Sequence, residues 1–278
     1  MASSSDAAAL LAERIVIILV EPQHPGNVGA TARAMKNMGL SRLTLVNPPA
    51  WDPETARWMA PGCDDLLSSI RHVATVEEAL QDVTFAVAST ARHRKQRQPV
   101  MEPAELVRKV YKSEPSQVTG ILFGREDFGL ATTDVNRCAA LLRIPTPEHA
   151  SLNLAQAVLI VCHALFEGGR ERGLIASGRT LGGSRGTNTT AGVSTKSARD
   201  DPADLTQVEP AVMELLGLLE RVGYLRGTRP DKVVLTARQA LQRAQISRRH
   251  TEALRGMVKR IGWALDHPNA DWEKTAKG

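Results

Sequence analysis

Residues 14–40 read RIVIILVEPQHPGNVGATARAMKNMGL, and this stretch decides the fold class of the chain. It begins with an unbroken apolar run over residues 15–20, which is typical of a strand covered on both faces of a parallel sheet. A segment rich in Pro, Gly and Asn follows, and a helical pattern then extends over residues 28–38. A strand that passes through a short turn into a helix is the repeating unit of α/β proteins.

The same alternation continues to about residue 170. Apolar runs predict strands at residues 14–20, 42–46, 84–88, 118–123 and 141–144. Helices are predicted between and after them, at residues 28–38, 54–59, 77–80, 103–111, 133–138 and 151–167. Because the strands are apolar nearly throughout and alternate with helices, the predicted fold class is α/β with a parallel sheet.

The composition changes after this α/β part. Fourteen of the 24 residues at 177–200 are Gly, Ser or Thr, which predicts a flexible linker. Only helical periodicity follows, with Pro230 suited to a helix start and one apolar stripe formed by Leu254, Met257, Ile261 and Leu265. The predicted division is a flexible tail at 1–13, an α/β domain at 14–175, a linker at 176–205, a helical module at 206–267 and a tail at 268–278.

The net charge of +5 is unevenly distributed. Residues 207–263 contain eleven Lys and Arg against five acids, and a second cluster occupies ARHRKQRQ at 91–98. Such patches commonly bind a polyanion, although each could also be an ordinary solvated face. The candidate RNA-binding residues are Arg92, Arg94, Lys95, Arg97, Arg248 and Arg249.

Several classes of protein are disfavoured. No apolar run approaches the roughly 18–20 residues of a membrane span, and the N-terminus lacks the pattern of a secretory signal. Cys63, Cys138 and Cys162 have no metal-binding or disulfide spacing, which predicts reduced thiols in a cytoplasmic protein. The histidines also lack ligand spacing, so no metal is expected.

Three segments with candidate chemistry follow predicted strands, where parallel sheets bind ligands. In the first, Gly26, Asn27 and Gly29 open a helix and Arg33 lies one turn further along. The alternatives are a helix cap for Asn27 and a solvated position for Arg33. The segment is not GxGxxG, which disfavours a nicotinamide site.

The second segment is ILFGREDFGL at 121–130, and the third is IPTPEHASLNLAQAV at 144–158. Leu130 stands where a phosphate-binding Walker loop needs Lys, so that function is excluded. In the third segment Ser151 could cap the long helix, which would place Asn153 in the first turn. Each segment alone is a weak signal.

In this order and spacing, the three segments resemble the motifs of the SPOUT superfamily of knotted RNA methyltransferases, and most closely the TrmJ type of tRNA (cytidine/uridine-2′-O)-methyltransferases. The resemblance covers residues 14–170, and the basic helical module is similar to that family's C-terminal extension. It implies a deep C-terminal trefoil knot, a rare exception to unknotted connectivity. It also implies a homodimer that methylates a pyrimidine 2′-hydroxyl, at position 32, in the anticodon loop of tRNA.

The resemblance also implies the site residues. S-adenosylmethionine would be held by Ser89, Thr90, Ala91, Gly124, Ile144, Ser151, Leu152 and Asn153. Arg33 would be catalytic. Asn27, Glu126 and Ser151 would shape the acceptor site and hold Arg33 in place. His149 departs from the aromatic residue that relatives often have at this position, which puts base preference and fine donor contacts in doubt.

Elementary chemistry narrows the role of Arg33. An arginine is effectively never deprotonated in proteins, so it is better suited to orient a phosphate and stabilise a developing alkoxide than to act as a base. Two other functions remain open from the sequence: a SPOUT enzyme that acts on rRNA, and an RNA-binding protein without catalysis.

Overall fold

The computed structural model describes residues 12–49, 51–91, 98–114, 116–147, 151–175, 202–225, 229–244 and 246–267. Several predictions lie outside these residues. They concern most of the N-terminal tail, the linker up to residue 201, the basic cluster Arg92, Arg94, Lys95 and Arg97, His149 and the tail at 268–278.

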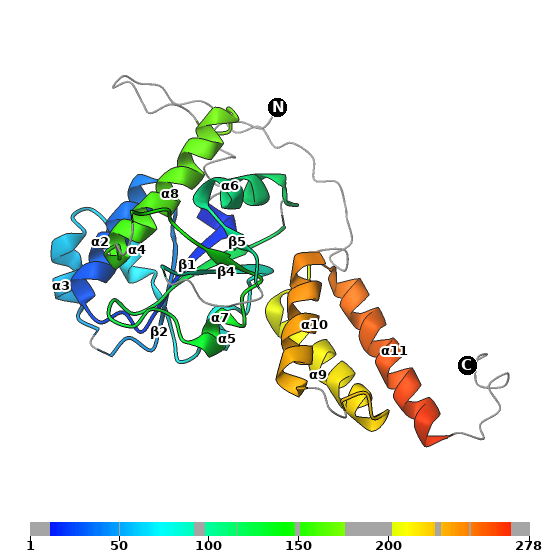
Figure 1. Ribbon diagram of the computed structural model, residues 1–278. Helices are drawn as coiled ribbons and strands as arrows, with labels where there is room; N and C mark the ends of the chain where they lie inside the picture. The colour runs from blue at the N-terminus through cyan, green and yellow to red at the C-terminus, as the bar shows by residue number, and fades with distance from the viewer. Residues whose placement is uncertain are drawn as a thin grey trace.

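Seven parallel strands form one sheet in the order β3-β2-β1-β6-β4-β7-β5 (Figure 1). Their bounds are β1 Ile15–Val20, β2 Arg42–Val46, β3 Arg71–Val73, β4 Phe85–Ser89, β5 Val100–Met101, β6 Thr119–Phe123 and β7 Ala140–Leu142. Every pair of neighbouring strands is parallel. The predicted α/β fold with a parallel sheet is confirmed.

Helices cover both faces of the sheet. The helices are α2 Pro25–Asn37, α3 Pro53–Met59, α4 Asp64–Ser68, α5 Val76–Ala79, α6 Pro103–Lys112, α7 Thr132–Val135 and α8 Leu154–Glu171. Side chains of α2, α4, α6 and α8 share one apolar core with alternate residues of β1, and those of α5 and α7 share a second core with the others. The unbroken apolar run of β1 is thus explained by burial on two faces.

The strand order carries a further implication. Strand β6 lies between β1 and β4, and β7 lies between β4 and β5, so each of the last two strands lies between strands formed earlier in the sequence. This order is consistent with a chain that threads back through its own fold. The trefoil knot stays a prediction.

Arg14 differs from its predicted place in the first strand. It precedes β1 and is buried, and its guanidinium donates hydrogen bonds to the carbonyl oxygens of Val110, Glu114 and Gln117 at 3.2, 2.8 and 3.1 Å. These carbonyls lie in the last turn of α6 and just beyond it, where a cation complements the helix dipole. Arg14 therefore closes the end of a helix instead of continuing a strand.

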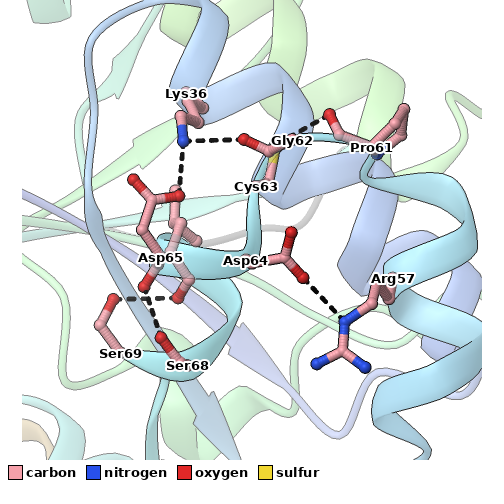
Figure 2. A network of polar contacts seen from close by, with 10 residues as sticks. Lys36, Arg57, Pro61, Gly62, Cys63, Asp64, Asp65, Ser68 and Ser69 are labelled. Atoms are coloured by element: carbon pink, nitrogen blue, oxygen red, sulfur yellow. Dashed lines mark hydrogen bonds and ion pairs between the residues drawn. The ribbon is translucent and has the colours of Figure 1, made fainter.

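Polar contacts join α2, the helix of the first motif, and α3 to α4 and to the turn that precedes α4 (Figure 2). The Lys36 Nζ atom donates to the Gly62 carbonyl at 2.8 Å and pairs with Asp65 at 2.5 Å, while Arg57 pairs with Asp64 at 2.8 Å. On the side of α2 that faces α3, Gly29 permits close approach, because a Cβ there would lie 2.0 Å from the Ala56 carbonyl oxygen. Gly29 is therefore explained by packing between helices.

The C-terminal module consists of α9 Leu205–Arg221, α10 Pro230–Ala244 and α11 Arg248–Asp266, with α9 in contact with both other helices. Pro230 begins α10, as predicted. The structure differs at the end of the predicted linker: Ala203 is buried and its N–H donates to the Ile246 carbonyl at 2.8 Å. The ordered module therefore begins before residue 206.

The predicted apolar stripe of α11 is not the most buried side of that helix. Met257, Ile261 and Leu265 of α11 are about half exposed, whereas Val258 and Gly262 are buried.

The three cysteines are free and buried, and burial raises the pKa of Cys162 to about 12. Within the described residues, none of the helices has the length and apolar character needed to cross a membrane.

Candidate active site

A cavity of about 1100 Å³ lies at the edge of the sheet where β4, β6 and β7 end. The predicted donor-binding residues that line it are Ser89, Thr90, Ala91, Gly124, Ile144, Ser151 and Leu152. Asn153 does not line the cavity, although it lies at the start of α8 beside it. Topology thus brings the second and third sequence motifs and the end of β4 to one cavity, as expected for the ends of parallel strands.

The second motif forms a tight turn along the cavity wall. Gly129 has a φ of +72°, and its N–H donates to the Arg125 carbonyl at 2.8 Å. A Cβ at Gly124 would lie 2.2 Å from the Gly129 carbonyl carbon, so only glycine fits where the turn closes. Arg125 is held by Asp127 at 2.8 Å and by Glu21 at 3.3 Å.

Asn27, Glu126 and Asn153, one from each motif, form a hydrogen-bonded network. The Asn27 Nδ2 atom donates to Glu126 Oε1 at 2.7 Å, and Asn153 Nδ2 donates to Asn27 Oδ1 at 3.1 Å. The backbone N–H of Gln23 donates to Glu126 Oε2 at 2.9 Å, so both carboxylate oxygens are bound. The three motifs are therefore connected physically and not only adjacent.

Hydrogen bonding determines the charge of Glu126. Burial raises the pKa of its carboxyl, but hydrogen bonds from Gln23 and Asn27 outweigh that effect, so the pKa lies below its ordinary value. Glu126 is therefore an ionised acceptor at neutral pH. It holds Asn27 in place and is not a proton donor.

The structure corrects the predicted helix caps. Asn153, not Ser151, is the N-cap residue of α8, and its Oδ1 accepts from the N–H groups of Ala155 and Gln156 at 2.9 and 3.4 Å. The N-cap position of α2 is His24, so Asn27 is inside the first turn and is not a cap. Ser151 is exposed and lines the cavity.

Arg33 stands apart from this network. It is exposed on α2, does not line the cavity and forms no hydrogen bond or ion pair with any residue that the structure describes. Asn27 and Glu126 were expected to hold Arg33, but they bind each other and Asn153. The guanidinium of Arg33 is thus available to a group outside this chain.

The basic module divides into paired and exposed cations. Arg221, Arg229, Arg238 and Arg255 form ion pairs with Asp266, Asp231, Glu209 and Glu214. Part of the positive charge counted in the sequence is therefore structural. Arg248 and Arg249 are exposed at the first two positions of α11.

The sequence interpretation missed several residues of the site. Gln23 lies within the first motif, but its contribution is a backbone N–H, which no side-chain pattern can indicate. Glu102 and Arg143 also line the cavity. Glu102 follows the two-residue strand β5, which is too short to predict. Among the described residues no cluster of three or more His, Cys, Asp or Glu could hold a metal ion.

Comparisons with known proteins agree with this geometry. Residues 14–163 match the model of the SpoU rRNA Methylase family. The tRNA (cytidine/uridine/adenosine-2′-O-)-methyltransferase TrmJ of Pseudomonas aeruginosa is 31% identical over 93% of this chain and 99% of its own length. The tRNA (cytidine/uridine-2′-O-)-methyltransferase TrmJ of Yersinia pestis is 32% identical over 94% and 96%.

A solved structure is similar over both parts of the chain. TrmJ from Z. mobilis ZM4 has a TM-score of 0.69 and 31% identity, covering 89% of this chain and 98% of that one. The family and the class of enzyme predicted from the three motifs are confirmed. This chain belongs to the SpoU rRNA Methylase family, within the SPOUT superfamily, and is a methyltransferase.

Proposed function

We propose that this chain transfers a methyl group from S-adenosylmethionine to a ribose 2′-hydroxyl of tRNA, at the pyrimidine of position 32 in the anticodon loop. The observation that carries the proposal is the Asn27–Glu126–Asn153 network beside an open cavity at the strand ends. The TrmJ proteins that it resembles are named as tRNA 2′-O-methyltransferases, which supports tRNA as the substrate and the ribose 2′-oxygen as the methylated atom.

The cavity fits the donor in size and lining. Phe123, Leu130, Ile144 and Leu152 provide apolar contact for a nucleobase, and Ser89 and Thr90 add polar groups. The missing side chain at Gly124 lets the turn of the second motif close tightly against the strand end, which shapes this wall of the cavity. Bound there, S-adenosylmethionine would supply a methyl group on a sulfonium that carries its own leaving group.

The chain's own residues would position the acceptor. Asn27, fixed by Glu126 and Asn153, is hydrogen-bonded to a residue of the cavity wall, Glu126, and can orient a ribose beside it. Arg33, further along the same helix, would bind an adjacent phosphate and stabilise the negative charge that develops on the 2′-oxygen as its proton passes to water. Ser151, exposed at the cavity, would contact donor or acceptor.

The proposed enzyme is a cytoplasmic homodimer. Apolar side chains stand exposed on two helices that both pack against α2: Trp58 and Met59 on α3, and Leu159 and Ile160 on α8. Such a face is typical of a surface that a partner covers. A second copy on this face would bring another chain close to Arg33.

Methyl transfer from labelled donor to separate pools of tRNA and rRNA tests the proposal. Alkaline cleavage of RNA needs a free 2′-hydroxyl, so a methylated position resists alkali and can be mapped. We expect label in tRNA at an alkali-resistant site in the anticodon loop. Label confined to rRNA, or methylated bases that leave the backbone alkali-sensitive, would refute the proposed substrate or chemistry, and full RNA binding without transfer would indicate a binding protein.

A further inference from the structure

The helical module packs on the α/β domain, with α9 and α10 nearer to that domain than α11 (Figure 1). The N–H of Leu205 donates to the Val83 carbonyl at 3.0 Å, and the Leu205 side chain packs against the core that contains Val83. On α10, Gln242 Nε2 donates to the Arg137 carbonyl at 2.9 Å. Two helices of the module therefore contact the same side of the sheet.

Arg137 connects this contact to charges on both sides. Its guanidinium pairs with Glu77 of α5. Burial lowers the pKa of Arg137, nearby Arg238 lowers it further, and Glu209 opposes that effect. Arg238 and Glu209 are themselves an ion pair between α10 and α9. Arg137 therefore interacts electrostatically with charged side chains of the docked module.

Several buried polar atoms at the contact between α10 and Arg137 lack hydrogen-bond partners within the part of the chain that the structure describes. Buried atoms without a hydrogen-bond partner among the described residues include Arg137 Nε, Gln242 Oε1 and Gln239 Nε2, the last one turn earlier on α10. Burying polar atoms without partners costs free energy. These three atoms reduce the net stability of the docked arrangement.

The hydrogen bond between Gln242 and Arg137 lies close in sequence to a residue that lines the donor cavity. Arg137 lies two residues after Val135, which ends α7 and lines the cavity. The Val135 carbonyl is held from the other side by Gln98 Nε2 at 3.0 Å. Gln242 thus fixes the chain immediately after a cavity wall.

We propose that the Gln242–Arg137 contact couples the helical module to the donor site: the docked module supports the α7 wall, and undocking weakens donor binding. This inference rests on the proposed function, because the ligand of the cavity is taken to be S-adenosylmethionine or its product. By linkage, donor binding favours the docked module to the same extent. Gln242 and Arg137 are positioning residues that touch neither reactant.

The test uses the full chain and S-adenosylhomocysteine as probe. Gln242→Arg places a second cation against Arg137 and should undock the module, while Ala240→Arg adds the same charge at an exposed position of the same helix. Hydrogen exchange at the N–H of Leu205, which donates across the contact to the Val83 carbonyl, reports docking, and calorimetry reports affinity. We expect faster exchange and an affinity at least about fivefold weaker for Gln242→Arg only, the lower end of usual coupling.

Each other outcome is decisive. Faster exchange with unchanged affinity would show that undocking does not reach the donor site, and unchanged exchange would show that the contact does not hold the module in solution; both overturn the inference. If the unaltered chain itself fails to bind S-adenosylhomocysteine, the proposed function fails instead. Circular dichroism checks that α9, α10 and α11 stay helical in both variants.

Discussion

At the scale of single residues, the site depends on an amide at position 27. Asn27 donates to a carboxylate through Nδ2 and accepts through Oδ1, and only an amide side chain does both in this geometry. Asn153 uses its amide in the same way, donating to Asn27 and capping α8. Hydrogen bonds are therefore donated in one direction, from the amino end of α8 through Asn153 and Asn27 to the Glu126 carboxylate.

Asn27→Asp tests this direction. The change replaces the donor with a second carboxylate facing Glu126, so the network should break through like-charge repulsion. We expect methyl transfer to fall by at least about tenfold, as when a positioning hydrogen bond is lost. Asn37→Asp, at the exposed last position of α2, makes the same change outside the network and should keep full activity. Equal activities in the two variants would contradict the role of Asn27.

The lowered pKa of Glu126 makes a prediction about pH. A carboxyl with a depressed folded-state pKa stabilises the protein above its unfolded pKa of about 4.3, and that stabilisation is lost as pH falls through the folded pKa. Glu126→Gln should therefore be less stable than the unaltered chain at neutral pH, with the difference shrinking below about pH 4. Urea unfolding across this range measures it, with Glu54→Gln on exposed α3 as control. A difference that is independent of pH would count against ionised Glu126.

Arg33 is the residue whose role depends most on a partner. Because Arg33 is exposed and forms no hydrogen bond or ion pair with a described residue, Arg33→Ala should leave stability and donor affinity unchanged. Turnover should fall by about tenfold to a hundredfold, the effect of a lost charge-assisted contact. Arg33→Lys should recover only part of it, since a point charge does not replace a planar fork. Normal turnover of the alanine variant would remove Arg33 from the mechanism.

At the scale of elements, the position of α2 depends on one glycine. Gly29→Ala would place a Cβ 2.0 Å from the Ala56 carbonyl oxygen, so α2 and α3 must separate. Overpacking of this kind costs about 1–3 kcal/mol. Gly26→Ala is the matched control, because its Cβ would meet Met59 at an ordinary 3.6 Å. Thermal unfolding should show a lower Tm for Gly29→Ala alone, and similar Tm values would refute the packing role.

The strands that could be predicted are the ones buried on two faces. Strands β1, β2 and β6 can be recognised from their apolar runs, because helices cover both faces of the sheet and nearly every side chain of these strands is buried. Strands β3 and β5 have three and two residues with partial exposure, and they exist because a longer neighbour pairs with them. Local sequence has no signal for such pairing, which also explains why Glu102 at the end of β5 was missed.

The buried face of α11 shows the opposite limit. Periodicity places the large residues Met257, Ile261 and Leu265 on one apolar stripe, yet the helix buries Val258 and Gly262. The reason lies on another element: the Gly262 carbonyl accepts from Arg221 of α9, which also pairs with Asp266. Close approach at a glycine and two polar contacts select the face, and a hydrophobic pattern cannot encode either.

The candidate site was predictable only in part for a related reason. The motif residues could be assigned to one edge of the sheet because parallel strands end together. Their bonding could not be assigned, because the choice between Arg33 and Asn153 as the partner of Asn27 depends on where α8 begins. That start is fixed by the Asn153 cap, two positions beyond the predicted Ser151.

At the scale of the whole molecule, chemistry and charge lie in different parts. The cavity belongs to the α/β domain, while exposed cations without a described partner occur at the start of α11. Arg248 and Arg249 occupy the first two helical positions, where the helix dipole disfavours cations. The stability of α11 therefore does not explain why Arg248 and Arg249 are there. Binding of an anion from outside the chain would explain them.

Arg248→Ala with Arg249→Ala should weaken tRNA binding and flatten its salt dependence. Phosphate contacts release counterions, so each lost contact lowers the slope of log affinity against log salt by about one. Stability should be unchanged or slightly higher, because two cations leave the positive end of a helix. Filter binding at several salt concentrations measures the slope, and the double change to lysine keeps both charges and should keep it. If the alanine variant retains the original slope and affinity, the start of α11 does not contact the phosphates, and the positively charged cluster at 91–98 becomes the main candidate for holding the tRNA.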